Sequence, residues 1–149
     1  MVEISPLRPW DRVKWEALAR GYKAFYETVV PDAGYEETWQ RLINGGELYG
    51  IAARLDGEVV GIAHYLFHAN VWSAGACYLQ DLFVDEAARG RGAARALIEQ
   101  VADAARERGV PRLYWHTRQD NAQARALYDK IARHRGFICY DVVLDGPQN

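Results

Sequence analysis

The sequence predicts a mixed α/β domain in which helices pack against a central sheet, and three observations support this fold class. Strand-like and helix-like segments follow one another in the order β, α, α, β, β, β, α, β, α, β. Residues 78–105 combine a buried strand, a glycine loop and an amphipathic helix. The 149 residues match the usual length of one domain, so we expect a single domain over residues 1–149.

The N-terminal third of the chain contains one expected strand and two expected helices. Residues 3–7 alternate like a strand. Apolar residues at helical spacing between Val13 and Thr28, with Phe25 on the same face, predict one helix. A second, shorter helix is expected over residues 32–44, where two consecutive glycines end it.

The middle of the chain has the pattern of a β-hairpin. Residues 48–55 and 59–67 are rich in β-favourable side chains, and the Asp56-Gly57 pair between them is typical of a two-residue turn. After residue 105, the pattern predicts a strand over residues 113–117, a helix begun by Asn121 and ended by Gly136, and a last strand over residues 137–144.

The stretch from Tyr78 to Ala105 contains the clearest binding signal. Its strand ends at Asp85, and apolar residues then recur at helical spacing. A helix start carries up to four unpaired backbone N–H groups and about half a positive charge, which suits a phosphate group. A simple glycine turn is the alternative. The loop between strand and helix consists of Arg89, Gly90, Arg91, Gly92, Ala93 and Ala94.

Composition and charge are those of an ordinary globular protein, with 50% hydrophobic and 26% charged residues. No run of about 18 apolar residues and no signal-peptide pattern is present, so we expect a cytoplasmic protein without a membrane partner. Up to Asp85 there are seven Lys and Arg against twelve Asp and Glu; from Glu86 onward there are eleven against eight. This asymmetry suits an anion in the second half and a cation in the first, although solvated surface charge explains it equally well.

Two motifs resemble the GNAT superfamily of N-acetyltransferases. The loop matches the Arg-x-x-Gly-x-Gly/Ala pyrophosphate pattern, whereas dinucleotide and P-loop motifs fit it less well. The strand over residues 78–84 is similar to that of polyamine N-acetyltransferases and of a branch described as acetylating histones, polyamines or amino acids. A second motif is matched by Asn121, Ala124, Leu127, Tyr128, Gly136 and Phe137.

The resemblance implies a central twisted, mostly antiparallel sheet flanked by helices, and acetyl transfer from acetyl-CoA to a primary amine in a ternary complex. The acceptor would be a polyamine, an amino acid or a lysine-type side chain, free or in a peptide. In the family the pantetheine arm lies against the strand before the loop, by main-chain contacts. The implied coenzyme A contacts are Leu82, Phe83, Val84, Arg89, Gly90, Arg91, Gly92, Ala93, Ala94 and Asn121, of which Asn121 is alternatively only a helix cap.

The catalytic candidates are Tyr128 and Asp81. By resemblance Tyr128 gives a proton to the departing thiolate, and a core tyrosine is the alternative. The amine must lose a proton, because at neutral pH about one molecule in a few thousand is unprotonated when its pKa is about 10.4. Gln80 stands where the polyamine enzymes commonly have a glutamate base, so the neighbouring Asp81 is the candidate. Alternation points Asp81 to the other face unless a β-bulge re-aims it, and a structural aspartate is the alternative.

The candidate substrate-binding residues are Tyr26, Glu27 and Gln80. The first two match the Tyr-Glu pair that contacts the amine in the polyamine enzymes, and an exposed helix pair is the alternative. Further candidates for an acidic and aromatic acceptor pocket are Asp32, Glu36, Trp39 and Trp72.

Histidines and cysteines do not indicate a metal site. His64 and His68 share a face of one expected strand, but no third ligand accompanies them. Cys77 and Cys139 are expected to be buried, unpaired thiols.

Two other functions remain open at this point. A non-catalytic acyl-CoA-binding domain would keep the loop, although binding alone does not require Tyr128. A nucleic-acid binder is disfavoured, because the arginines of the second half alternate with acidic residues and the pI is about 6.1. We also expect a homodimer in which residues 137–144 pair across a two-fold axis.

Overall fold

The computed structural model describes residues 1–145, which fall into two compact units: residues 1–115, and the residues from His116 onward. Each unit is described by itself below. None of the described helices is both long and apolar enough to cross a lipid bilayer.

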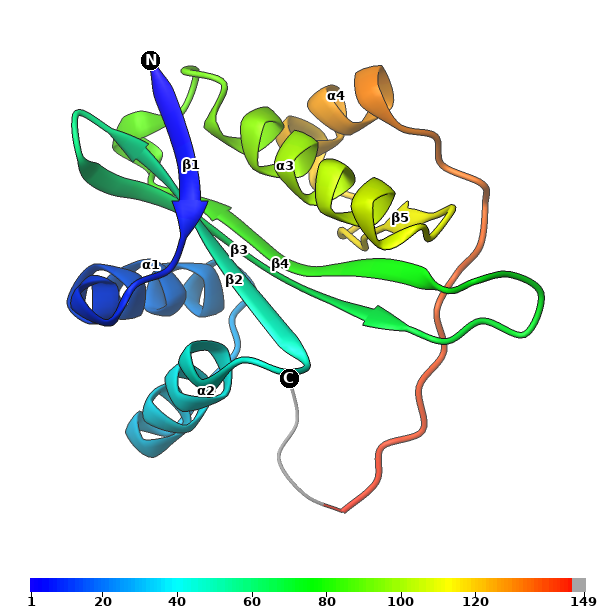
Figure 1. Cartoon of the computed structure of the whole chain (residues 1–149), viewed down its shortest axis with the longest axis horizontal. Helices are drawn as coiled ribbons and strands as arrows, with labels where there is room; N and C mark the ends of the chain where they lie inside the picture. The colour runs from blue at the N-terminus through cyan, green and yellow to red at the C-terminus, as the bar shows by residue number, and fades with distance from the viewer. Residues whose placement is uncertain (146–149) are drawn as a thin grey trace. The chain divides into compact units, whose positions relative to one another are not determined.

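The first unit is a five-stranded sheet with helices on both faces. The strand order is β1-β2-β3-β4-β5; the first four strands are antiparallel to their neighbours and β5 runs parallel to β4. Helices α1 and α2 lie on one face and α3 on the other (Figure 1). This confirms the mixed α/β, mostly antiparallel prediction. The elements are β1 (Val2–Pro6), α1 (Arg12–Phe25), α2 (Asp32–Asn44), β2 (Leu48–Leu55), β3 (Glu58–His68), β4 (Ala76–Val84), α3 (Ala93–Arg108) and β5 (Leu113–Tyr114), with short 3-10 turns at Pro9–Asp11 and Glu86–Ala88.

The hairpin between β2 and β3 forms as the sequence predicts. Leu55 pairs with Glu58, so the connection contains two residues. These are Asp56 and Gly57, with φ angles of 51° and 82°. Two positive φ angles are typical of the type I′ turn, whose twist suits a hairpin and which Asp-Gly favours.

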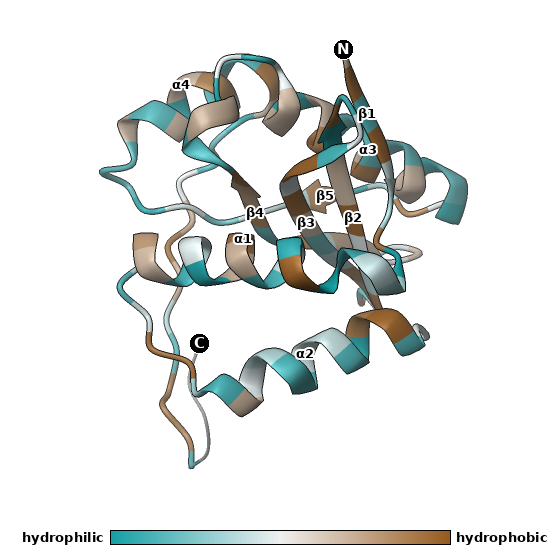
Figure 2. Cartoon of the chain, turned by 90° about the vertical axis from the view of Figure 1, so that its left-hand side faces the viewer, coloured by the Kyte–Doolittle hydropathy of each residue, from teal (hydrophilic) through white to brown (hydrophobic). Residues whose placement is uncertain are grey.

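The buried face of α1 differs from the expected one. Leu18 is buried as expected, but Val13 and Phe25 are exposed, and Trp15, which was not expected on this face, is buried. The Trp15 ring lies 5.1 Å from that of Trp39 on α2, and both belong to the core between the helices and the sheet. In Figure 2 the hydrophobic strands lie between these helices and α3. Aromatic side chains set the helix rotation here, because their burial removes the most apolar surface from water.

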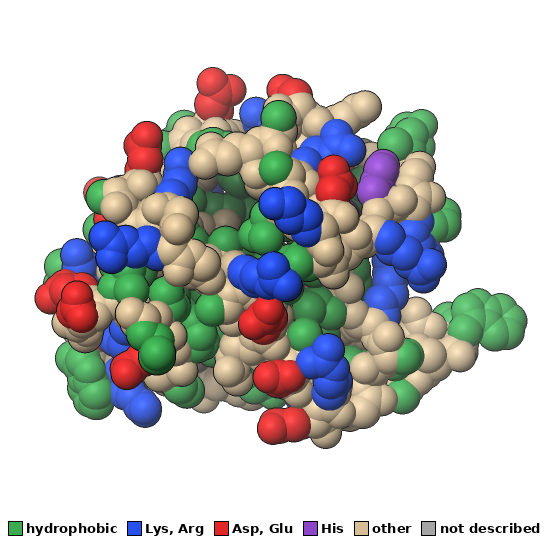
Figure 3. All heavy atoms as spheres, turned by 90° about the horizontal axis from the view of Figure 1, so that it is seen from above, with side chains coloured by type: hydrophobic (Ala, Val, Ile, Leu, Met, Phe, Trp, Pro, Cys, Tyr) green, Lys and Arg blue, Asp and Glu red, His purple; other side chains and the backbone are tan. Residues whose placement is uncertain are grey.

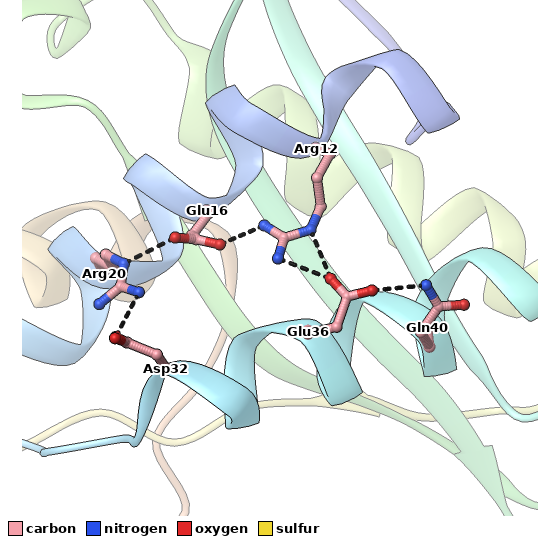
Figure 4. A network of polar contacts seen from close by, with 6 residues as sticks. All are labelled: Arg12, Glu16, Arg20, Asp32, Glu36 and Gln40. Atoms are coloured by element: carbon pink, nitrogen blue, oxygen red, sulfur yellow. Dashed lines mark hydrogen bonds and ion pairs between the residues drawn. The ribbon is translucent and has the colours of Figure 1, made fainter.

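A network of ion pairs joins α1 to α2 on the solvent side (Figure 4). Arg12 contacts Glu16 and, at 2.9 Å, Glu36; Arg20 lies 3.0 Å from Glu16 and 2.9 Å from Asp32. The predicted pocket role of Asp32 and Glu36 is therefore wrong, since both carboxylates bind arginines between the helices.

The two tryptophans that were assigned to that pocket also lie elsewhere. Trp39 is buried in the core, and Trp72 is 93% exposed in the connection between β3 and β4. The sequence pattern assigned these four acidic and aromatic residues to one acceptor pocket. In the fold they lie in three places: the interface between α1 and α2, the core, and the loop between β3 and β4.

The second unit contains one helix, α4 (Ala122–Ile131), within its described residues. Asn121 caps it as predicted, its Oδ1 accepting the N–H of Ala124 at 3.4 Å. The helix ends five residues before Gly136, because Ala132 already has extended φ and ψ angles.

The last predicted strand is absent from the described part of this unit. Residues 137–144 have no strand assignment, and their large apolar side chains are exposed, as is Cys139. The predictions of a formed strand and of a buried Cys139 are therefore wrong for this chain by itself. A strand requires a partner backbone for its hydrogen bonds, and sequence alone does not name that partner.

Candidate active site

A β-bulge in β4 shapes the site. His64 pairs with Asp81 and Tyr65 pairs with Leu79, so Gln80 has no partner on β3. One extra residue on a strand shifts the alternation of side chains and bends the strand. The β-bulge that would turn the Asp81 side chain to the other face of the strand is thus present. The Gln80 residue is exposed.

The bulge brings Tyr78 and Asp81 to the same tyrosine of α1, although they are three residues apart. Burial raises the pKa of the Tyr22 phenol, and Asp81, Tyr26 and Tyr78 raise it further because all three lie close to it. The Tyr22 ring also lies 5.0 Å from the Tyr26 ring. Asp81 is therefore a carboxylate in a largely aromatic environment.

Gly21 allows α1 to approach β4 closely enough for this contact. A Cβ atom on Gly21 would lie 3.0 Å from the Phe83 ring, which is tighter than normal van der Waals contact. The two elements border a groove of about 750 Å³, lined among others by Gly21, Phe83 and Arg89. Asp81 does not line this groove, so the groove and the Asp81 environment are separate features of the α1 face.

Asp81 is ionised at neutral pH. Burial raises its pKa, but the hydrogen bond from His64, the charge of Lys23 and the Tyr22 hydroxyl together hold it below the ordinary 3.8. The His64 Nδ1 lies 2.8 Å from Asp81 Oδ2. On its far side, His64 accepts a hydrogen bond from the Trp15 indole. Neither Trp15 nor the structural role of His64 was predicted.

One edge of β4 lacks a strand partner beyond its first half. Within the described residues, β5 pairs with β4 only at Cys77 and Tyr78. From Leu79 to Val84 the edge opposite β3 is free of ladder hydrogen bonds from β5. This edge of β4 therefore has main-chain groups that β5 does not use.

The main-chain groups of Leu82 and Val84 point to this free edge. The N–H of Asp85 donates to the carbonyl of Val60 on β3 at 2.8 Å. Because main-chain groups alternate sides along a strand, those of Phe83 also turn to β3, and those of Leu82 and Val84 turn away from it. These two are the positions expected to pair with amide groups of a ligand, whereas Phe83 packs its ring against Tyr22 on α1.

The loop before α3 presents backbone N–H groups. No side chain caps this helix start, and the first helical bond runs from Ala96 N–H to the Gly92 carbonyl at 3.0 Å. The N–H groups of residues 93–95 precede that bond. Gly90 and Gly92 have φ angles of 82° and 80°, and apart from each glycine and its adjoining residues no protein atom lies within 4 Å of a Cβ built there. The loop therefore has the open glycine face and the donors that a pyrophosphate requires.

The three arginines of this region differ in their engagement. The Arg89 guanidinium lies 5.9 Å from the centre of the Phe83 ring, and Arg95 forms an ion pair with Glu99 at 3.1 Å. Arg91 is exposed and makes no hydrogen bond or ion pair with other described residues. Arg91 is thus the cation most available to an anion bound at the loop.

The remaining predicted residues are placed as follows. Tyr26 ends α1 and belongs to the aromatic group around Tyr22, whereas Glu27 is exposed in the turn after it, with a φ angle of 55°. Asn121 and Tyr128 belong to the second unit. Their roles in binding and catalysis stay predictions.

Two other kinds of site are not supported. Among residues 1–145 no group of three or more His, Cys, Asp or Glu residues could hold a metal ion. On the face in Figure 3, blue Lys and Arg side chains are interspersed with red Asp and Glu, so this face carries no continuous basic stripe for nucleic acid.

Comparison with known proteins identifies the class. The model of the acetyltransferase (GNAT) family matches residues 15–132. The chain is 35% identical over 143 residues to the D-amino-acid N-acetyltransferase HPA3 of Saccharomyces cerevisiae, covering 93% of this chain and 89% of that protein. It is 28% identical over 95 residues to a thialysine N-epsilon-acetyltransferase of Caenorhabditis elegans, covering 64% of this chain and 59% of that one.

Solved structures show the same fold. The ribosomal-protein-alanine N-acetyltransferase of Brucella melitensis biovar Abortus 2308 superposes with a TM-score of 0.81 at 24% identity, over 97% of this chain and 100% of that one. The chain belongs to the GNAT family. It is an acetyl-CoA-dependent N-acetyltransferase, which transfers an acetyl group to an amine.

Proposed function

We propose that this enzyme acetylates the amino group of a small amino acid, with the Asp81 environment as the acceptor site. The observation that carries this proposal is the position of one carboxylate, Asp81, among tyrosines, with the Lys23 Nζ 5.8 Å from the centre of the Tyr22 ring. A carboxylate next to aromatic rings attracts an ammonium group by charge and cation–π interaction. Lys23 offers the opposite charge, which suits the carboxylate of a zwitterion and repels a second ammonium group.

The relatives support an amino acid over a polyamine. HPA3 is named for D-amino acids and the nematode relative for thialysine, and both acceptors carry an amino group and a carboxylate. The absence of a glutamate at position 80 points the same way, since Gln80 cannot act as the base of the polyamine enzymes.

The proposed reaction forms a bond between the amine nitrogen and the acetyl carbon and breaks the carbon–sulfur bond of the thioester. The amine's proton passes to Asp81 and then to water, because a carboxylate with a pKa below 3.8 does not retain a proton at neutral pH. Tyr128, by its motif alone, donates a proton to the departing sulfur.

The proposed cosubstrate contacts divide between loop and strand. Backbone N–H groups at the start of α3, with the Arg91 charge, bind the pyrophosphate, and the free main-chain groups of Leu82 and Val84 pair with the pantetheine amides. Asn121 is a further proposed contact. Acetyl-CoA supplies the activated acetyl group.

Thiol release from acetyl-CoA tests the acceptor class with a matched set: a D-amino acid, its L-enantiomer, its α-amide and a polyamine. We expect turnover of the amino acid, with a KM about tenfold or more below that of the amide, since a hydrogen-bonded charge contributes about 1.5–3 kcal/mol. Lys23→Met should remove this preference, and Lys14→Met on the same helix should retain it. Equal KM values for amino acid and amide would contradict the zwitterion proposal, and tight acetyl-CoA binding without any turnover would favour a non-catalytic binding domain.

We also propose that residues 1–149 form one acetyltransferase domain, which acts in the cytoplasm as a homodimer. The family match spans both units, and the two cysteines are unpaired. The exposed apolar residues between Phe137 and Leu144 support a partner strand from a second copy. Deleting the residues after Phe137 should give a monomer or an insoluble protein, and an unchanged dimer on size-exclusion chromatography would contradict the homodimer.

A further inference from the structure

A chain of hydrogen bonds leads from the core to the proposed acceptor site. The Trp15 Nε1–H donates to His64 Nε2 at 2.9 Å, and His64 Nδ1 lies 2.8 Å from Asp81 Oδ2. Trp15 is 1% exposed, and the side chains of His64 and Asp81 are 11% and 21% exposed. The chain therefore begins inside the protein and ends on a carboxylate that solvent and substrate can reach.

The donor and acceptor roles in this chain follow from Trp15. An indole nitrogen can only donate a hydrogen bond, so His64 Nε2 must accept it. The ring hydrogen of His64 then lies on Nδ1, which donates to Asp81. Trp15 therefore donates to His64, and His64 donates to Asp81. The hydrogen bond from His64 fixes the orientation of the Asp81 carboxylate.

We propose that Trp15 and His64 are positioning residues, which hold the Asp81 carboxylate charged and directed at the amino group of the acceptor. This inference rests on the acceptor role of Asp81 proposed above. Both residues act through Asp81, because their burial keeps them from the substrate. The rigidity of the arrangement is supported by the Trp15 ring, which packs on Trp39 at 5.1 Å.

The charge of Asp81 depends on groups from two elements. His64 faces it from β3, and Tyr22 and Lys23 face it from α1. Burial opposes the charged form and raises the pKa of Asp81, while the hydrogen bond from His64 is the largest effect that lowers it. Without His64 the pKa of Asp81 rises, so the carboxylate becomes protonated, and loses the amine, at a higher pH than in the native enzyme.

Four variants separate positioning from general stability. His64→Leu removes the donor to Asp81, and His64→Asn retains an amide N–H near the place of Nδ1. Trp15→Phe keeps an aromatic ring but removes the indole N–H. His68→Leu is the matched control, since His68 lies on the same strand and also uses both ring nitrogens, with Tyr114 Oη at 2.7 Å from Nε2.

Steady-state kinetics across pH gives the functional readout. In His64→Leu we expect the KM for the amine to rise about ten- to hundredfold, the value of a hydrogen bond to a charged group, with a smaller change in kcat. The acid limb of kcat/KM should move to higher pH, His64→Asn should recover most of the loss, and His68→Leu should match the native enzyme. A His64→Leu enzyme with the KM and pH profile of His68→Leu would overturn the proposal.

Nitrogen-15 NMR of the full chain without substrates gives a second readout that does not depend on turnover. The native protein should show His64 protonated on Nδ1, and Trp15→Phe should lose this fixed tautomer. A native Nε2–H tautomer would overturn the proposed chain. A native enzyme that acetylates no amine would instead refute the proposed function, and with it the role of the chain, so the two failures are distinguishable.

Discussion

Two glycines at opposite ends of α3 allow a sharp test of the anion-binding loop. Gly92 precedes the helix with a φ angle of 80°, and Gly109 follows it with a φ angle of 79°. Apart from each glycine and its adjoining residues, no protein atom lies within 4 Å of a Cβ built on either one. Gly92→Ala and Gly109→Ala therefore place the same methyl group in the same left-handed conformation, but only the first places it at the proposed pyrophosphate site.

The expected cost to stability is the same for both variants. An alanine in the left-handed region costs about 1–2 kcal/mol, and neither methyl group meets the protein. For a chain of this length 1 kcal/mol corresponds to a shift of about 2–4 °C in Tm. Thermal unfolding should therefore show two similar, small decreases.

The expected cost to cosubstrate binding differs between the two variants. At Gly92 the methyl group obstructs an anion that approaches the first N–H groups of α3, and a lost hydrogen bond to a charged group costs about 1.5–3 kcal/mol. Titration calorimetry should give a Kd for acetyl-CoA about ten- to hundredfold higher for Gly92→Ala and unchanged for Gly109→Ala. Equal Kd values for the two variants would refute the assignment of the loop.

Three further predictions concern other parts of the chain. Asp11 is buried and its carboxylate binds Arg54 at 2.9 and 2.8 Å, so Arg54→Met should lower the free energy of unfolding at pH 7 by about 3 kcal/mol in denaturant titrations. Arg54 holds the pKa of Asp11 below 3.8 against the opposing effect of burial, so this stabilisation is present above pH 3.8 and should fade as the pH falls through the folded-state value; a difference that persists unchanged in acid would contradict the assignment. Burial raises the pKa of the Cys77 thiol to about 11, so a thiol reagent at pH 8 should modify Cys139 quickly and Cys77 only after unfolding; two fast thiols would be the contrary result. Tyr128→Phe should lose turnover while calorimetry shows the native affinity for acetyl-CoA, and unchanged turnover would exclude Tyr128 as the acid.

Local patterns in the sequence were sufficient for most of the sheet and for the loop. The Asp56-Gly57 turn, the strand ending near Asp85 and the glycine loop each depend on neighbouring residues, and all are present. The family motif also pointed to Leu82 and Val84, whose main-chain direction agrees with it. Such features are readable because their physical causes lie within a few residues of one another.

The parts that sequence did not predict depend on distant partners. Trp15 and His64 are 49 residues apart, and their contact follows from the packing of α1 on β3. The bulge at Gln80 was considered but could not be placed, because it appears only in the register with β3. One signal was available in retrospect: a histidine in the middle of a hydrophobic strand requires polar partners, and Asp81 and a tryptophan were candidates.

The C-terminal segment shows the same limit. Residues 137–144 have strand-like composition, yet a strand also requires a partner edge. The apolar composition of these residues predicts a strand but does not indicate which strand edge it would pair with. In the described chain their large apolar side chains are exposed.

The most direct test of the central claim is a reaction with acetyl-CoA that carries carbon-13 in its acetyl group. We predict that the label appears as an amide on the amino nitrogen of an amino acid, that product forms in proportion to the thiol released, and that Asp81→Asn lowers kcat/KM for the amine. If acetyl-CoA binds and remains intact with every amine, or if Asp81→Asn acetylates the amino acid as fast as the native enzyme, the account of this site is wrong.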